Sequence, residues 1–158
     1  MEHAAQGHEP KHYRRLLVMT VISFIAMYVL MYAMVDRLAN VYPNFNQFYM
    51  AGLMAAAMVA IELVVMSGMY PNKRRNLFLV VASIVALAIF WMLIRRQTAI
   101  TERQFLKSMI PHHAGAILMC QQSSLQDPEV VRLCEGIVQG QQAEIDQMKA
   151  KLRELEQR

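Results

Sequence analysis

The sequence predicts an all-α membrane protein in which three transmembrane helices are followed by an antiparallel two-helix hairpin. Three apolar runs occupy the first two thirds of the chain, and each is long enough to cross a bilayer core of about 30 Å. Beyond Gln97 the apolar residues recur at intervals of three and four, which is typical of amphipathic helices. These patterns divide the chain into a polar histidine-containing tail (1–15), a transmembrane domain (16–96) and a helical hairpin domain (97–158).

The three spans are expected at residues 16–35, 48–69 and 77–94. Because no water reaches the bilayer core, backbone groups must be hydrogen-bonded within each span, and a helix achieves this. Hydrophobic residues make up 56% of the chain, against about 45–50% in soluble domains, which agrees with three buried spans. We therefore expect the lipid bilayer to be a partner of the chain.

The orientation of the spans is predicted from the basic residues at their ends. Lys and Arg are frequent in the N-terminal tail and in the second loop, whereas the first loop holds only Arg37. The positive-inside rule then places the N-terminus in the cytoplasm and the C-terminal hairpin outside it. Arg95 and Arg96 oppose this orientation, since they lie on the predicted outer side. Basic residues at the ends of apolar runs mark a membrane flank rather than a nucleic-acid surface, so we expect no nucleic-acid partner.

The tail and the second span contain the first candidate metal ligands. His3 could bind copper or nickel together with the terminal amine, although a solvated tail without metal is the interpretation we favour. In the second span, side chains spaced by four drift slowly around one helix face. Thioethers in a row suit Cu(I), and a carboxyl inside a span usually faces protein or water. Helix packing is the favoured interpretation of this row and a Cu(I) pathway is the alternative for Met50, Met54, Met58, Glu62 and Met66.

Two further helices are predicted after the spans, each with a capping signal. Thr101 followed by Glu102 indicates the start of the first, and Asp127 followed by Pro128 indicates the start of a second that runs to about Glu156. The short connection makes the two helices antiparallel neighbours. On the second helix a heptad seam contains Val131, Cys134, Val138, Gln141, Ile145, Met148, Leu152 and Leu155.

The first of these helices is apolar over an unusually wide face. Two adjacent stripes repeat with the same spacing, as expected for a helix inside a bundle rather than at its rim. Pro111 interrupts the pattern and should kink the helix. One stripe contains Phe105, Met109, His112, Ala116 and Met119, and the other contains Leu106, Ile110, His113, Ile117 and Cys120.

Nitrogen and sulfur donors on this helix suggest metal binding. His112 and His113 project about 100° apart on a helix, so each would join ligands one or two turns away, such as Met109, Met119 or Cys120. Imidazole combined with sulfur suits Cu(I), and less specifically Ag(I) or Zn. The alternative is a pair of core histidines with hydrogen-bonded rings.

The two cysteines and the absence of catalytic patterns limit other functions. Cys120 and Cys134 lie near the predicted turn on opposite helices, where burial is favoured and a disulfide or a shared metal are the alternatives. A di-iron site would need Glu-x-x-His pairs, and neither hairpin helix contains one. No acid is placed to orient either His112 or His113 for nucleophilic catalysis, so we do not expect an enzyme.

The segment from Phe105 to Met119, with its Met-Ile-Pro-His-His core, resembles the domain-of-unknown-function 305 family, as does the later pattern of Gln141, Glu144 and Met148. This resemblance implies a ferritin-like bundle and copper binding linked to copper resistance, in exported bacterial proteins. It further implies that Gln141 and Glu144 support the ligands or set the bundle register. Cys120 stands where a small residue is more usual, so a thiolate ligand is not carried over. The copper ligands implied by the resemblance are Met109, His112, His113, Met119 and Met148.

One hairpin cannot bury both sides of its apolar surface, so we expect two or more chains to pair their hairpins into a four-helix bundle. The expected function is Cu(I) sequestration or hand-over outside the bacterial cytoplasmic membrane, as part of copper homeostasis, with a copper chaperone or an efflux pump as a partner. The alternatives are a small copper channel that uses the methionine row and a structural membrane protein without metal.

Overall fold

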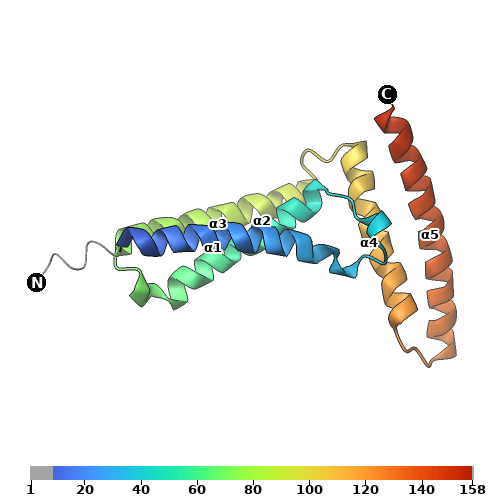
Figure 1. Cartoon of the computed structure of the whole chain (residues 1–158), viewed down its shortest axis with the longest axis horizontal. Helices are drawn as coiled ribbons and strands as arrows, with labels where there is room; N and C mark the ends of the chain where they lie inside the picture. The colour runs from blue at the N-terminus through green and yellow to red at the C-terminus, as the bar shows by residue number, and fades with distance from the viewer. Residues whose placement is uncertain (1–8, 158) are drawn as a thin grey trace, which may run out of the picture. The chain divides into compact units, whose positions relative to one another are not determined.

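A computed structural model describes residues 9–157, and this part of the chain is all-α, as predicted (Figure 1). No strand occurs within these residues. Short 3-10 turns, η1 (Met31–Met34), η2 (Leu38–Asn40) and η3 (Ser67–Met69), lie in the first two loops. The five helices are α1 (Glu9–Leu30), α2 (Phe45–Val65), α3 (Lys73–Arg96), α4 (Glu102–Gln122) and α5 (Pro128–Glu156).

Helices α1, α2 and α3 are the three predicted apolar helices. Each is long and apolar enough to cross a membrane, over Lys11–Met34, Phe45–Val65 and Lys73–Arg96. Each helix begins before its predicted span, but α1 and α2 end before theirs, at Leu30 and Val65, and the 3-10 turns η1 and η3 follow. At the start of α3, the Asn72 side chain accepts a hydrogen bond from the Arg75 amide, so helix begins four residues before the predicted span.

The chain folds into two compact units. The membrane unit contains the chain up to Leu30 and residues Phe48–Thr98, and the α4–α5 unit contains Met31–Gln47 and the chain from Ala99 onward. The sequence-based division differs here, because it grouped the first loop with the spans. The loop belongs with α4 and α5 because its apolar side chains pack into their core.

Small residues on α2 allow close contact with α3 in the membrane unit. Ala51, Gly52 and Ala55 are buried, and the Phe90 ring lies directly over Gly52. A Cβ atom added to Gly52 would overlap with that ring. Small residues have this role in membrane helices because van der Waals packing replaces the hydrophobic effect there.

Polar contacts join the helices at the end of the membrane unit where α1 and α3 begin. The Tyr13 hydroxyl on α1 donates to Asn76 Oδ1 on α3 over 2.7 Å. The Tyr70 hydroxyl donates to Glu62 Oε1 over 3.3 Å. Burial, and then the charge of Glu62, raises the pKa of Tyr70 above its ordinary value, so this hydroxyl remains a donor at neutral pH.

The contact between Gly52 and Phe90 predicts opposite outcomes for two glycine substitutions. Gly52→Ala should destabilise the membrane unit by roughly 1–3 kcal/mol, because the Phe90 ring must move to make room. Gly68→Ala is the matched control, since its new methyl group would meet nothing within 4 Å. Thermal unfolding in mild detergent, followed by fluorescence of the single tryptophan Trp91, measures the difference. Equal melting temperatures for the two variants would contradict the close contact.

Candidate functional site

The two helices of the α4–α5 unit begin at the residues that the capping signals predict. Thr101 caps α4, with its side-chain oxygen accepting from the Gln104 amide. Asp127 caps α5 and accepts from the Glu129 amide over 2.9 Å, with Pro128 at the first helical position. These contacts satisfy backbone donors that a helix start leaves unpaired.

Helices α4 and α5 lie side by side and run in opposite directions (Figure 1). Two contacts join the start of α4 to the end of α5. The Arg103 guanidinium donates to the Leu155 carbonyl, and Lys107 Nζ lies 3.3 Å from Glu156 Oε1. The other ends of the helices are joined by a disulfide between Cys120 and Cys134.

A core fills the space between these helices. Ile110 and Ile117 of α4 and Ile145 of α5 are almost fully buried. The predicted heptad seam of α5 faces this core, since each of its members is buried or half-buried. On α4, the stripe that contains Ile110 and Ile117 is the one that faces α5.

The first loop covers a second side of α4. Val35 and Tyr42 pack against the shared core, and the Met34 carbonyl oxygen would lie 3.4 Å from a Cβ atom on Gly115. Ala114 is fully buried. The small side chains at 114 and 115 therefore allow the loop backbone to approach the helix closely.

Polar side chains fix the loop in this position. Arg37 Nε donates to Asp36 Oδ2 over 2.8 Å, and Arg37 Nη2 reaches Gln142 Oε1 of α5 over 3.0 Å. Asn40 Nδ2 donates to the other oxygen of Asp36. Burial by itself would raise the pKa of the Asp36 carboxyl, but hydrogen bonds from Arg37 and Asn40 outweigh it and hold the pKa below its ordinary value. The charged form of Asp36 thus organises the loop.

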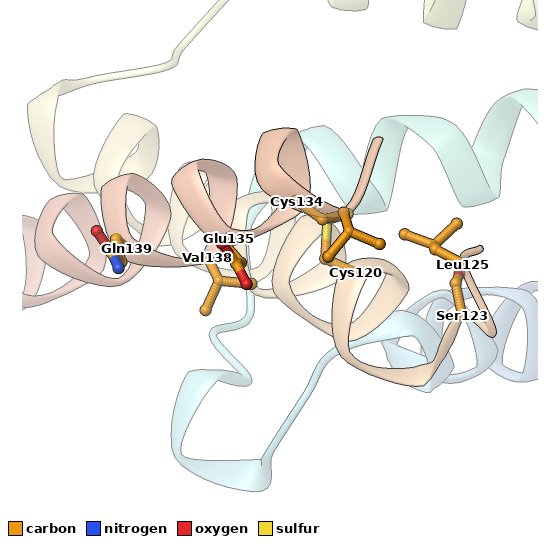
Figure 2. A pocket seen from close by; sticks show the side chains of 8 residues that line it. Cys120, Ser123, Leu125, Cys134, Glu135, Val138 and Gln139 are labelled. Carbon is orange, nitrogen blue, oxygen red and sulfur yellow. A yellow bond between two sulfur atoms is a disulfide. The ribbon is translucent and has the colours of Figure 1, made fainter. Parts of the chain in front are cut away.

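The disulfide changes the chemistry expected of the cysteines. Cys120 and Cys134 have Cα atoms 5.3 Å apart, and their sulfur atoms are bonded (Figure 2). The favoured expectation of simple burial was wrong, and the disulfide alternative is what the structure contains. The short turn places the two helices within bonding distance at this point. In this oxidised state neither sulfur is a thiolate, so neither is available as a metal ligand.

A shallow cavity of about 400 Å³ lies beside the disulfide, as Figure 2 shows. Its walls come from the end of α4, the connecting turn and the start of α5. Leu125 and Val138 contribute apolar surface, while Ser123, Glu135 and Gln139 contribute polar groups. Among the candidate ligands only Cys120 and Cys134 line it, and both are held in the disulfide; no histidine or methionine is among its lining residues.

His113 is held by protein groups at both ring nitrogens. Nδ1 lies 2.9 Å from the Met109 carbonyl oxygen, and Nε2 lies 2.7 Å from Glu144 Oε2 on α5. Both contacts are hydrogen bonds only when both nitrogens carry protons, because both partners are acceptors. Glu144 therefore contacts a candidate ligand, and the supporting role that the family resemblance implies for it stays a prediction. In this arrangement His113 links α4 to α5 and offers no free nitrogen to a metal.

The other stripe of α4 faces outward, and we call it the outer stripe. His112 and Met119 are exposed, as is Phe105, while Met109 and Ala116 are half-buried. Met109 lies one helical turn before His112, and Met119 lies two turns after it. One imidazole and two thioethers thus share an accessible face of one helix.

The remaining candidate ligands are not gathered with the outer stripe. Met148 packs against the core between α4 and α5, and Gln141 is half-buried on the same seam. In residues 9–157 no group of three or more His, Cys, Asp or Glu side chains is arranged to hold a metal ion. His3 lies outside the described residues.

The methionine row of α2 has mixed surroundings. Met50 is exposed, as is Met66 just beyond the end of α2, whereas Met54 and Met58 are half-buried. Glu62 accepts the hydrogen bond from Tyr70 described above, so its carboxyl faces a protein group. A Cu(I) pathway along this row stays a prediction.

Sequence reasoning missed the part of the first loop in this unit. The buried residues Asn40 and Asn44 and the half-buried Tyr42 have no helical period. The available signal was the wide apolar face of α4, which required a second cover besides α5. A short loop with aromatic and amide side chains was a candidate for that cover.

The pKa of Asp36 predicts a pH dependence for the α4–α5 unit. An unfolded aspartate has a pKa of about 3.9, so the stabilisation by charged Asp36 is fully present above that pH and is lost as the pH falls through its lower folded value. Asp36→Asn should cost about 1 kcal/mol at pH 7 and little at pH 2. Hydrogen exchange of residues 106–118 in the full-length protein measures both. Glu135→Gln, at an exposed position on α5, is the control, and a difference that persists at pH 2 would contradict this role for Asp36.

The adjacent histidines should differ in their effect on stability. His113→Ala removes two contacts from a nearly buried ring and should destabilise the metal-free protein by about 2 kcal/mol. His112→Ala changes an exposed residue and should stay within about 0.5 kcal/mol. Hydrogen exchange across α4 and α5 reports both changes. Comparable losses in the two variants would show that His113 has no special structural role.

The comparisons with known proteins support one family. The model of the domain of unknown function DUF305 matches residues 92–152, which cover α4 and most of α5. An uncharacterized protein of Acanthamoeba polyphaga mimivirus is 30% identical over 142 residues, which are 88% of this chain and 91% of the viral protein. No solved structure matches the chain. Because the family model matches the helices that carry the candidate ligands, the region of residues 92–152 belongs to the DUF305 family, and the viral relative extends the similarity along 88% of the chain.

Proposed function

We propose that this protein binds Cu(I) on the outer stripe of α4 and sequesters it or hands it over outside the cytoplasmic membrane. The observation that carries the proposal is the accessible set of soft donors, with His112 exposed between Met109 and Met119. Cu(I) prefers thioether and imidazole ligands, whereas hard cations prefer oxygen. Copper is the cargo of the protein in this proposal, and Ag(I) or Zn would be weaker mimics.

The two histidines have separate roles in this proposal. His113, bonded to Glu144 and to the Met109 carbonyl, holds α4 against α5 and so positions the outer stripe. His112 provides the accessible nitrogen. This division agrees with the geometry of a helix, on which adjacent residues project about 100° apart.

Two copies of the chain would complete the copper site. The outer stripe of one α4 provides few donors, and its large apolar side chain Phe105 is 51% exposed. Pairing two outer stripes would bury Phe105 and bring two sets of His and Met donors together. The resulting four-helix bundle is the ferritin-like arrangement that the family resemblance implies. The proposal of paired chains rests on this exposed apolar surface, which a homodimer or a higher oligomer would cover.

The membrane unit serves as the anchor. Its three apolar helices support membrane association, and the positive-inside rule favours a cytoplasmic N-terminus with the α4–α5 unit in the periplasm. Copper bound there would pass to a chaperone or an efflux pump as part of copper homeostasis. Binding and transfer require no bond-breaking chemistry, so the proposal does not include an enzyme.

Cu(I) titration of the full-length protein in mild detergent, against a competing chelator, tests the proposal. His112→Ala combined with Met119→Leu should weaken Cu(I) binding by roughly 10- to 100-fold or more, because supporting residues alone change metal affinity by that factor. Folding should be unaffected, since both side chains are exposed.

Met92→Leu is the matched control, because Met92 is also exposed but lies in the membrane unit. Unchanged affinity in the double variant would rule out the outer stripe as the copper site. A protein that remains monomeric at every copper ratio, yet keeps full affinity, would exclude the site shared between two copies.

A further inference from the structure

Six cationic side chains gather at one end of the membrane unit. They come from the first two turns of α1 and the first turn of α3, and Figure 1 places the beginnings of these helices at the same end of this unit. The Tyr13 hydroxyl joins the two helices there through Asn76, and the Arg75 guanidinium lies 5.9 Å from the centre of the Tyr13 ring. The six exposed cations are Lys11, Arg14, Arg15, Lys73, Arg74 and Arg75.

An apolar groove begins at two of these cations and follows α1 into the span. It has a volume of about 440 Å³, and two rows of side chains spaced by four residues form its walls. Val18 and Ile22 are 51% and 61% exposed, so neighbouring helices leave the groove open. The rise of a helix gives it a length of roughly 12 Å. One row is Arg14, Val18 and Ile22, and the other is Arg15, Met19 and Ser23.

We propose that this groove binds one anionic phospholipid. The phosphate would lie against the guanidinium groups of Arg14 and Arg15, and an acyl chain would follow Val18, Met19 and Ile22 into the bilayer. Guanidinium groups bind phosphate oxygens with two parallel hydrogen bonds, and the row spacing on a helix leaves a channel between side-chain ridges. The remaining four cations disfavour a headgroup that carries its own positive charge.

The groove makes this a defined site rather than a general attraction to the membrane surface. A basic cluster alone attracts any anionic surface in proportion to its charge. Here Arg14 and Arg15 also form one end of the apolar groove on the same helix face. A bound lipid must therefore satisfy a charge requirement and a chain requirement together.

The full-length protein in mild detergent is titrated with phosphatidylglycerol or phosphatidylcholine of identical chains, and bound lipids are counted by native mass spectrometry. We expect one phosphatidylglycerol to bind tightly and phosphatidylcholine to bind more weakly. Arg14→Gln combined with Arg15→Gln should lower the affinity for phosphatidylglycerol about 30-fold, which is about 2 kcal/mol. Arg132→Gln with Arg153→Gln is the control, because it makes the same charge change at exposed positions on α5.

Ile22→Trp tests the groove without changing the charge. The larger side chain should fill the groove and weaken the binding of phosphatidylglycerol, while all six cations remain. Unchanged binding in Ile22→Trp would reduce the site to a general basic surface and overturn the proposal. Equal binding of the two lipids, or an equal loss in the α5 control, would also overturn it.

Discussion

The wide apolar face of α4 is the constraint on which the α4–α5 unit depends. A helix that is apolar on two sides must be covered on two sides, because exposed apolar surface costs about 25 cal/mol per Å². Helix α5 covers the side that contains Ile110 and Ile117. The first loop covers the side that contains Ala114 and Gly115, where the small side chains allow its backbone to lie close. Neither α5 nor the first loop covers the outer stripe, so it stays exposed.

This arrangement links the α4–α5 unit to the membrane helices through the chain itself. The loop that covers α4 is the connection between α1 and α2, so both of its ends continue into the membrane unit. A fragment containing only residues 97–158 would lack Val35 and Tyr42 and would expose the side of α4 that they cover. The loop between the first two spans thus supplies a part of the core of the α4–α5 unit. Asp36 and Arg37 fix this part by polar contacts that apolar periodicity does not reveal.

The elements that the sequence predicted well are those governed by local rules. Apolar length located the three long apolar helices, and the capping residues Thr101 and Asp127 located the starts of α4 and α5. The heptad spacing of α5 identified the residues that face α4. The packing of the first loop against α4 was not predicted, since its contacts with α4 join residues about 70 positions apart in the sequence. The disulfide stayed one of three alternatives because the distance between Cys120 and Cys134 depends on how the turn brings two helices together.

The candidate site shows the same limit at the scale of a single motif. His112 and His113 are adjacent in the sequence and appear equivalent as metal ligands. On a helix they cannot face the same way, so one must point toward α5 when the other points outward. His113 lies on the stripe of α4 that contains Ile110 and Ile117 and faces α5, and there it pairs with Glu144 of the second helix. The protein environment therefore divides one motif into a residue that holds the two helices together and a residue that remains accessible. A metal bound at His112 would be supported by a helix that its neighbour keeps in place, so loss of either histidine should impair binding for different physical reasons.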